Sequence, residues 1–173
     1  YAKGDSFTVA ANQPSASGYL FIGWLNKARN TVNGSVSEVY AGGELVTIPE
    51  NAGSTLTLDA LWASADEAQD ETVTYDASAH SLDFSETVSD IIGSKYAAYL
   101  EDNQIKVNVT YAATKDGEAV TLADTSVNPS FVNVGEYVIT ATYNIQVDGD
   151  ADGTVDYTIS YTDEATLTID YES

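Results

Sequence analysis

The stretch YVITATYNIQV, residues 137–147, decides the fold class because apolar and polar side chains alternate along it without interruption. Strict alternation with a period of two is typical of a β-strand that turns one face to a core and the other to water. The core-facing side chains of this predicted strand are Tyr137, Ile139, Ala141, Tyr143, Ile145 and Val147.

The same period recurs on both sides of this stretch. It runs through residues 105–111, where Ile105, Val107, Val109 and Tyr111 share a face, and returns in residues 155–161 and 165–171. Turn residues separate the predicted strands, among them Asp116-Gly117 and Asn128-Pro129. Several short strands within about 100 residues are typical of an immunoglobulin-like β-sandwich. We therefore expect a mainly β protein.

Composition excludes several classes of protein. The 173 residues include 27 Asp and Glu but only 6 Lys and Arg, for a net charge of −21, and 43% are hydrophobic. That hydrophobic share is too high for simple disorder. The charge disfavours nucleic acid and anionic membranes as partners, and no apolar run approaches the ~20 residues that span a bilayer. With no Cys there are no disulfides. The chain opens on Tyr1 and lacks Met, so we expect it to be a piece of a longer protein.

Charge is distributed unevenly along the chain. Residues 1–63 hold five acids and three bases, a net of −2, whereas the other 110 residues hold 22 acids and three bases, a net of −19. A step of this kind is a domain-boundary signal. It coincides with residues 64–71, which contain four acids and no large apolar side chain. We predict a domain over 1–63, an acidic linker over 64–71 and a second domain over 72–173. The alternative is a solvated loop or short helix within one domain.

The predicted second domain contains three motifs that recur in bacterial immunoglobulin-like repeats. They are VTYDASAHSL at 73–82, PSFVNVGEYVITA at 129–141 and ATLTI at 165–169. The segment from about residue 70 to 171 resembles those repeats of large surface proteins, in which a "tYdG…H" opening, a "vGtYtVta" strand and an "atLtI" strand follow in order. Ala77 stands where the opening often has Gly. The resemblance implies an immunoglobulin-like β-sandwich.

The first 63 residues carry a sharper signature. GYLFIGW at 18–24 is followed by LDALW at 58–62, and KGDSFTV at 3–9 fits a preceding strand. Alternation puts Tyr19, Phe21 and Gly23 on one face and Leu20, Ile22 and Trp24 on the other, and the glycines allow a bulge. These motifs resemble the Listeria–Bacteroides repeat, the internalin-type B repeat. The resemblance implies a small β-grasp-like domain that occurs in tandem in secreted, cell-wall-attached proteins, and hence an extracellular location on a bacterial cell surface.

One loop has the composition of a metal site. In DGDADGTVD, residues 148–156, the acids Asp148, Asp150 and Asp152 and then Gly153 match the first half of a calcium-binding loop, and Asp156 falls at its ninth position. The twelfth position is Ile159, so the acid that usually closes such a site is absent. The alternative is a solvated acidic hairpin tip, because Asp and Gly are ordinary turn residues. We call residues 148–156 the Asp-rich loop.

No catalytic or cofactor-binding residue is expected, and the Asp-rich loop is a candidate calcium site only. His80 is the only histidine, and its place in the repeat opening favours a structural role. Trp24 and Trp62 fit core positions of the first repeat, with stacking on a sugar ring as the alternative. An intramolecular Lys–Asn isopeptide bond is disfavoured because no Asn lies in the last predicted strand. We therefore predict that the chain is not an enzyme.

The expected function follows from the two resemblances. They imply a non-catalytic stalk or spacer of an adhesin-like bacterial surface protein, with neighbouring repeats of the same chain as partners. High negative charge keeps repeated copies apart and in solution. The alternative is an adhesive module for host glycan, mucin or protein, which the 12 Tyr favour. A third is an accessory region of a carbohydrate-active enzyme.

Overall fold

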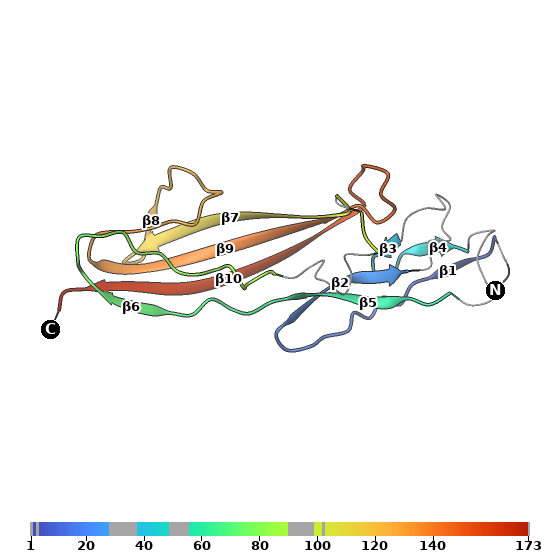
Figure 1. The fold of residues 1–173 in the computed structure, drawn as a ribbon, viewed down its shortest axis with the longest axis horizontal. Helices are drawn as coiled ribbons and strands as arrows, with labels where there is room; N and C mark the ends of the chain where they lie inside the picture. The colour runs from blue at the N-terminus through green and yellow to red at the C-terminus, as the bar shows by residue number, and fades with distance from the viewer. Residues whose placement is uncertain are drawn as a thin grey trace. The chain divides into compact units, whose positions relative to one another are not determined.

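The computed structural model describes residues 2, 4–27, 38–48, 56–89, 99–101 and 103–172. Within these residues the fold is all-β, with ten strands in three sheets and no helix (Figure 1). The prediction of a mainly β protein is therefore confirmed. The more specific arrangement of a β-grasp domain and an immunoglobulin-like domain stays a prediction.

The chain divides into two compact units. Unit 1 comprises residues 1–64, 90–106 and 145–159, and unit 2 comprises residues 65–89, 107–144 and 160–173. The first segment of unit 1 ends where the predicted linker begins. Unit 1 also takes in two segments from within the predicted second domain, one of which contains the Asp-rich loop.

Unit 1 contains two small antiparallel sheets. In the first, β2 (Tyr19–Asn26) lies between β3 (Glu38–Tyr40) and β5 (Asp59–Ser64). In the second, β1 (Ser6–Thr8) pairs with β4 (Leu45–Thr47). Burying apolar side chains is what stabilises so small a unit, and its fully buried apolar residues include Ile22, Leu25, Val39 and Leu61.

A β-bulge interrupts β2 in the middle of the aromatic motif. Phe21 lies opposite Trp62 and Gly23 opposite Leu61, so Ile22 is the extra residue. Strict alternation places Phe21 and Trp24 on opposite faces, and this part of the prediction is wrong. The bulge brings their rings edge to face, with centroids 5.3 Å apart. Trp24 also packs on the cluster formed by Val9, Tyr40 and Val46.

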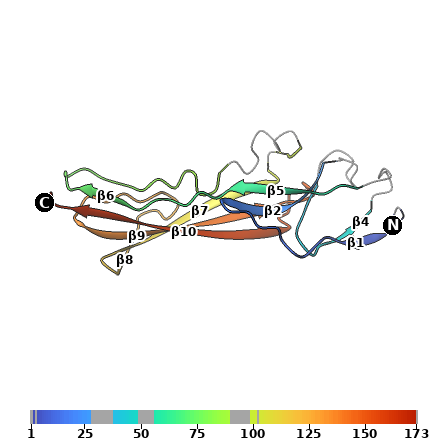
Figure 2. The same ribbon diagram turned by 90° about the horizontal axis from the view of Figure 1, so that it is seen from below.

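The largest sheet has five strands in the order β6, β10, β9, β7, β8 (Figures 1 and 2). Their bounds are β6 Glu71–Thr74, β7 Ile105–Lys115, β8 Glu118–Val120, β9 Gly135–Val147 and β10 Tyr157–Asp170. Every predicted core-facing residue of β9, from Tyr137 to Val147, is buried, so the alternation in the opening stretch is confirmed.

Residues 157–170 form one long strand, β10, although the sequence pattern predicts two. Its alternation of buried and exposed residues continues through Asp163, which points inward and is only 5% exposed. The two predicted strands are thus halves of a single strand that carries a carboxylate on its buried face.

Irregular segments cover the core face of unit 2. Leu82 and Phe84 are buried against β9 and β10 in a cluster that includes Ile139 and Leu167. The Tyr143 hydroxyl donates to the Phe84 carbonyl at 3.1 Å. Hydrogen bonds from strand side chains therefore satisfy backbone groups that lie outside any sheet.

Candidate functional site

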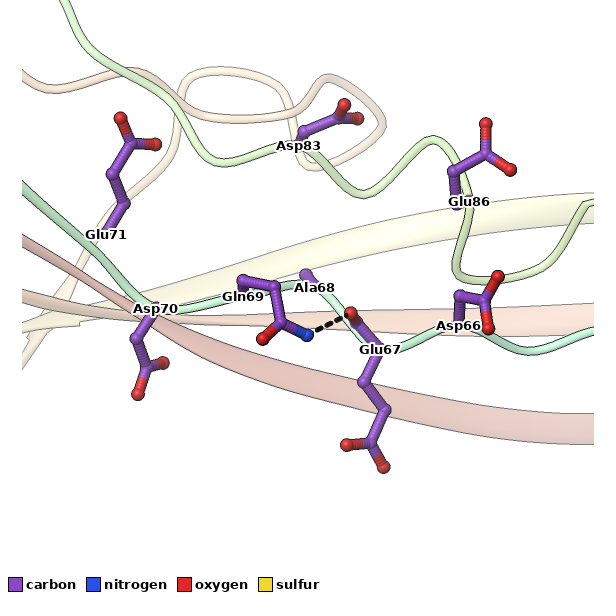
Figure 3. A pocket seen from close by; sticks show the side chains of 8 residues that line it. All are labelled: Asp66, Glu67, Ala68, Gln69, Asp70, Glu71, Asp83 and Glu86. Atoms are coloured by element: carbon purple, nitrogen blue, oxygen red, sulfur yellow. Dashed lines mark hydrogen bonds between the residues drawn. The ribbon is translucent and has the colours of Figure 1, made fainter. Parts of the chain in front are cut away.

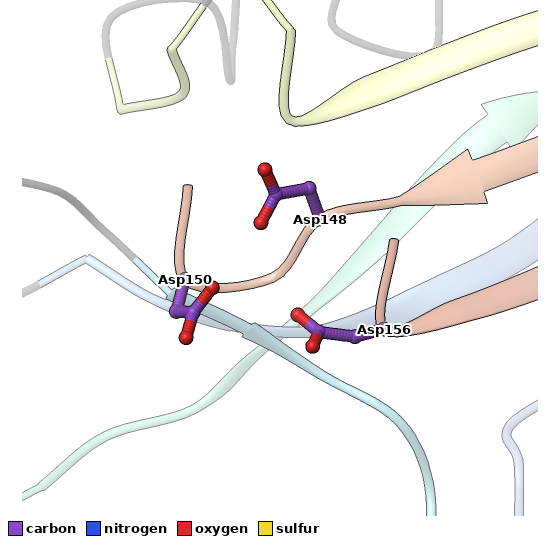
Figure 4. Close-up of side chains that lie close together, drawn as sticks. All are labelled: Asp148, Asp150 and Asp156. Atoms are coloured by element: carbon purple, nitrogen blue, oxygen red, sulfur yellow. The ribbon is translucent and has the colours of Figure 1, made fainter. Parts of the chain in front are cut away.

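The Asp-rich loop gathers three carboxylates. Oxygens of Asp148, Asp150 and Asp156 all lie within 4.8 Å of one another, and the side chains turn toward a common point (Figure 4). Asp152, the fourth predicted ligand, is not in this group. Its Oδ1 accepts a hydrogen bond from the Thr154 amide at 2.7 Å.

Backbone amides of the loop engage these carboxylates. Asp148 accepts from the amides of Asp152 at 3.1 Å and Gly153 at 2.8 Å, and Asp156 accepts from the Gly149 amide at 2.7 Å. Asp and Asn stabilise turns through bonds of this kind. The loop therefore holds its own shape through bonds between its carboxylates and its own amides.

Two glycines allow the hairpin to dock within unit 1. The Val39 amide of β3 donates to the Gly149 carbonyl at 2.9 Å, and a Cβ on Gly149 would collide with the Val39 carbonyl oxygen. The Tyr157 hydroxyl donates to the Ile22 carbonyl of β2 at 2.8 Å, in the space that a Cβ on Gly23 would fill. Close backbone approach of this kind requires glycine.

An acid far away in sequence completes the electrostatic environment of the loop. Glu44 lines, with Asp150 and Asp156, an open hollow of about 180 Å³. Burial raises the pKa of the Glu44 carboxyl, and the charges of Asp156 and Asp150 raise it further. The pKa of Asp150 is also raised, chiefly by burial. No sequence motif links Glu44 to the loop, since about a hundred residues separate them.

The three side chains offer carboxylate oxygens, which are the ligand atoms that a hard cation prefers. Calcium takes about six to eight oxygen ligands, mostly from carboxylates, carbonyls and water. Asp148, Asp150 and Asp156 supply carboxylates, and no His or Cys joins their group among the described residues. Exposed acidic groups are also common without an ion, so calcium binding at the predicted residues stays a prediction.

A second acidic hollow, of about 390 Å³, lies within unit 2. Segment 66–71 forms one side, and Asp83 and Glu86 come from the segment opposite (Figure 3). Figure 3 shows Glu67 and Asp70 pointing away from that opposite segment. Asp70 accepts from the Thr166 amide at 2.7 Å, so this carboxylate binds the backbone of β10.

The aromatic residues and His80 have structural contacts. Trp62 contacts Phe21 and Tyr19 edge to face, with ring centroids 5.6 and 6.4 Å apart. The backbone of His80 exchanges two hydrogen bonds with Phe131, at 2.8 and 2.9 Å, and its Nε2 lies 2.9 Å from Asp76. The structural interpretation of His80 agrees with these contacts. Tyr19 is 57% exposed, so one edge of the aromatic group is open to solvent.

Searches of protein-family models, curated proteins and solved structures found no match to this chain. Within the described part of the chain, no helix has the length and apolar character needed to cross a membrane.

Proposed function

We propose that the chain is a non-catalytic stalk segment of a bacterial surface protein, outside the cell, that presents other domains of the same protein. One observation carries the proposal. In unit 2 the first strand, β6, and the last strand, β10, pair in parallel, with Leu167 beside Glu71 and Asp170 beside Thr74. The chain therefore enters this strand pair at one end and leaves it at the other. A module with its entry and exit at opposite ends can be joined in series.

Two local features support the finer fold assignment for unit 2. The Tyr137 hydroxyl, near the start of β9, donates to the carbonyl of Asn133 four residues upstream at 2.9 Å. A bond of this type marks the tyrosine corner of immunoglobulin-like sandwiches. Ala77 has a φ of 62°, a conformation natural to glycine, and it occupies the position where related repeats often have Gly. On this basis we assign unit 2 to the immunoglobulin-like class. The β-grasp-like assignment of residues 1–63 rests on the resemblance of its sequence motifs alone.

An adhesive module is the second candidate function, and exposed aromatic rings favour it. Tyr75 and Tyr171 contact each other edge to face with centroids 5.6 Å apart, and they are 38% and 72% exposed. Exposed aromatic rings are suited to stacking on apolar faces of a ligand. The bound partner would be a host glycan, mucin or protein.

A binding screen separates the two functions. The full chain is applied to a glycan array and to immobilised mucin and host proteins, with a double variant, Tyr75→Ala and Tyr171→Ala, as the matched control. If the chain is a stalk, the wild type should show no saturable binding that depends on these two tyrosines. Saturable binding that depends on the two tyrosines would overturn it in favour of adhesion.

A further inference from the structure

We infer that the β6–β10 contact of unit 2 is a shear-resisting mechanical clamp, extended by the carboxylates of Asp70 and Asp163. The inference rests on the proposed stalk function and goes beyond it, because it names the element that bears tension.

The contact is longer than the strand β6 itself. Four residue pairs join β6 to β10 in parallel register, from Glu71–Leu167 to Thr74–Asp170. Beyond them, the Tyr75 amide donates to the Asp170 carbonyl at 2.7 Å. Backbone pairing thus continues past the C-terminal end of β6.

Two carboxylates extend the contact in the other direction. Asp70 Oδ1 accepts from the Thr166 amide of β10 at 2.7 Å. Asp163 Oδ2 accepts from the Ala68 amide at 2.8 Å and is itself buried in β10. Hydrogen bonds to charged groups are the stronger kind. Segment 68–75 is therefore bonded to β10 from Asp163 to Asp170.

The direction of pull decides how these bonds are loaded. Tension on the two ends of unit 2 draws β6 toward its N-terminus and β10 toward its C-terminus, so the two parallel strands slide past each other. Because the bonds of a parallel ladder are evenly spaced along the two strands, sliding strains all of them at once. Separation from one end instead breaks them one after another, and the force needed is lower.

Covalent connectivity gives tension two routes through the chain. Tension that enters unit 1 reaches β10 by one of two routes. The first is through residues 64–71 and β6, and the second is through residues 145–159, which belong to unit 1 and include the first residues of β10. The clamp bears the load on the first route. On the second route, the bonds of Gly149 to β3 and of Tyr157 to β2 bear it.

The test compares two pulling directions on the same full-length chain. The sequence has no Cys, so a pair of introduced cysteines gives unique attachment points for single-molecule force spectroscopy. Handles on Glu67→Cys and Glu172→Cys load the contact in shear. Handles on Ala79→Cys and Glu172→Cys load it from one end. All three positions are exposed.

The clamp predicts a rupture force several-fold higher in shear than from one end. Equal forces would overturn it. Asp70→Ala lowers the shear force, whereas Glu118→Ala, which removes an exposed charge from β8, leaves it unchanged. If Asp70→Ala leaves the shear force unchanged, the Asp70 carboxylate is not part of the clamp. Because the binding screen uses no force, a failure of the stalk function and a failure of the clamp are separate results.

Discussion

Replacing Asp163 with Ala tests whether the buried carboxylate holds unit 2 together. Its Oδ2 accepts from the Thr87 hydroxyl at 2.7 Å and from the Ala68 amide at 2.8 Å. Thr87 is 1% exposed, so water cannot replace the lost acceptor. A buried donor left unsatisfied costs about 1–3 kcal/mol. The Ala68 amide is only partly buried, so its loss of a partner adds less. Alanine also avoids the cost of burying a charge, so we expect a loss of about 2 kcal/mol.

The assay is urea unfolding followed by circular dichroism, with Asp170→Ala as the control. Asp170 lies on the same strand and is exposed, so its replacement should change stability by less than about 0.5 kcal/mol. Tryptophan fluorescence reports unit 1 alone, because Trp24 and Trp62 both belong to it. It therefore shows whether the loss is confined to unit 2.

A double-mutant cycle isolates the hydroxyl–carboxylate bond. Thr87→Val alone should cost about 1–2 kcal/mol. The double variant Thr87→Val and Asp163→Ala has no Thr87 hydroxyl left without an acceptor. Its loss of stability should therefore be about 1–2 kcal/mol smaller than the sum of the two single losses. A loss below about 0.5 kcal/mol for Asp163→Ala, or strict additivity in the cycle, would refute this reasoning.

Four further changes test other parts of the structure. Ala77→Gly relieves a left-handed φ of 62° and should stabilise unit 2 by up to about 1 kcal/mol in thermal unfolding, whereas Ala79→Gly should destabilise it. Gly149→Ala places a Cβ against a β3 carbonyl and should cost about 2 kcal/mol or more, read by tryptophan fluorescence; no loss would contradict the docking. Millimolar calcium should raise the Tm of the wild type but not of Asp150→Asn, and equal shifts would exclude the loop as the site. Burial raises the pKa of Glu44 in the folded state. The stability that Glu44 contributes is therefore fully present below its unfolded pKa and is lost as the pH rises through its folded pKa. Unit 1 should gain stability as the pH falls from 7 toward about 4.5, and Glu44→Gln should flatten that gain.

Period-two alternation predicts the long strands because the pattern can be recognised from the residues of one strand alone. The pattern at residues 137–147 identifies the buried face of β9 correctly. It fails in β7, where Val107 shares the predicted face of Ile105 but is 41% exposed. Two other failures have physical reasons. The bulge at Ile22 inserts a residue that no local pattern announces, and Asp163 breaks the hydrophobic alternation although its hydrogen bonds allow it to be buried. The sequence does contain a signal for the single long strand: Asp163 occupies an inward-facing position in an alternation that continues on both sides of it.

The candidate site is predictable only as far as it is local. Asp148, Asp150 and Asp156 come from one loop, and the spacing of that loop indicates their convergence. Glu44 comes from a turn far earlier in the chain, and it meets the loop only because Gly149 docks against β3. Long-range approach of this kind depends on tertiary packing, to which a linear motif is insensitive.

The interleaving of the two units changes how the net charge is shared. Counted along the chain, residues 1–63 hold −2 and the remainder −19. Counted by unit, unit 1 holds 12 acids and five bases, a net of −7, and unit 2 holds 15 acids and one base, a net of −14. The four acids of the Asp-rich loop account for most of the difference, because they lie in unit 1. Unit 1 thus concentrates four of its 12 acids in one docked loop. Unit 2 spreads its charge with almost no base to offset it. Copies of unit 2 would therefore repel each other, which agrees with the proposed stalk function.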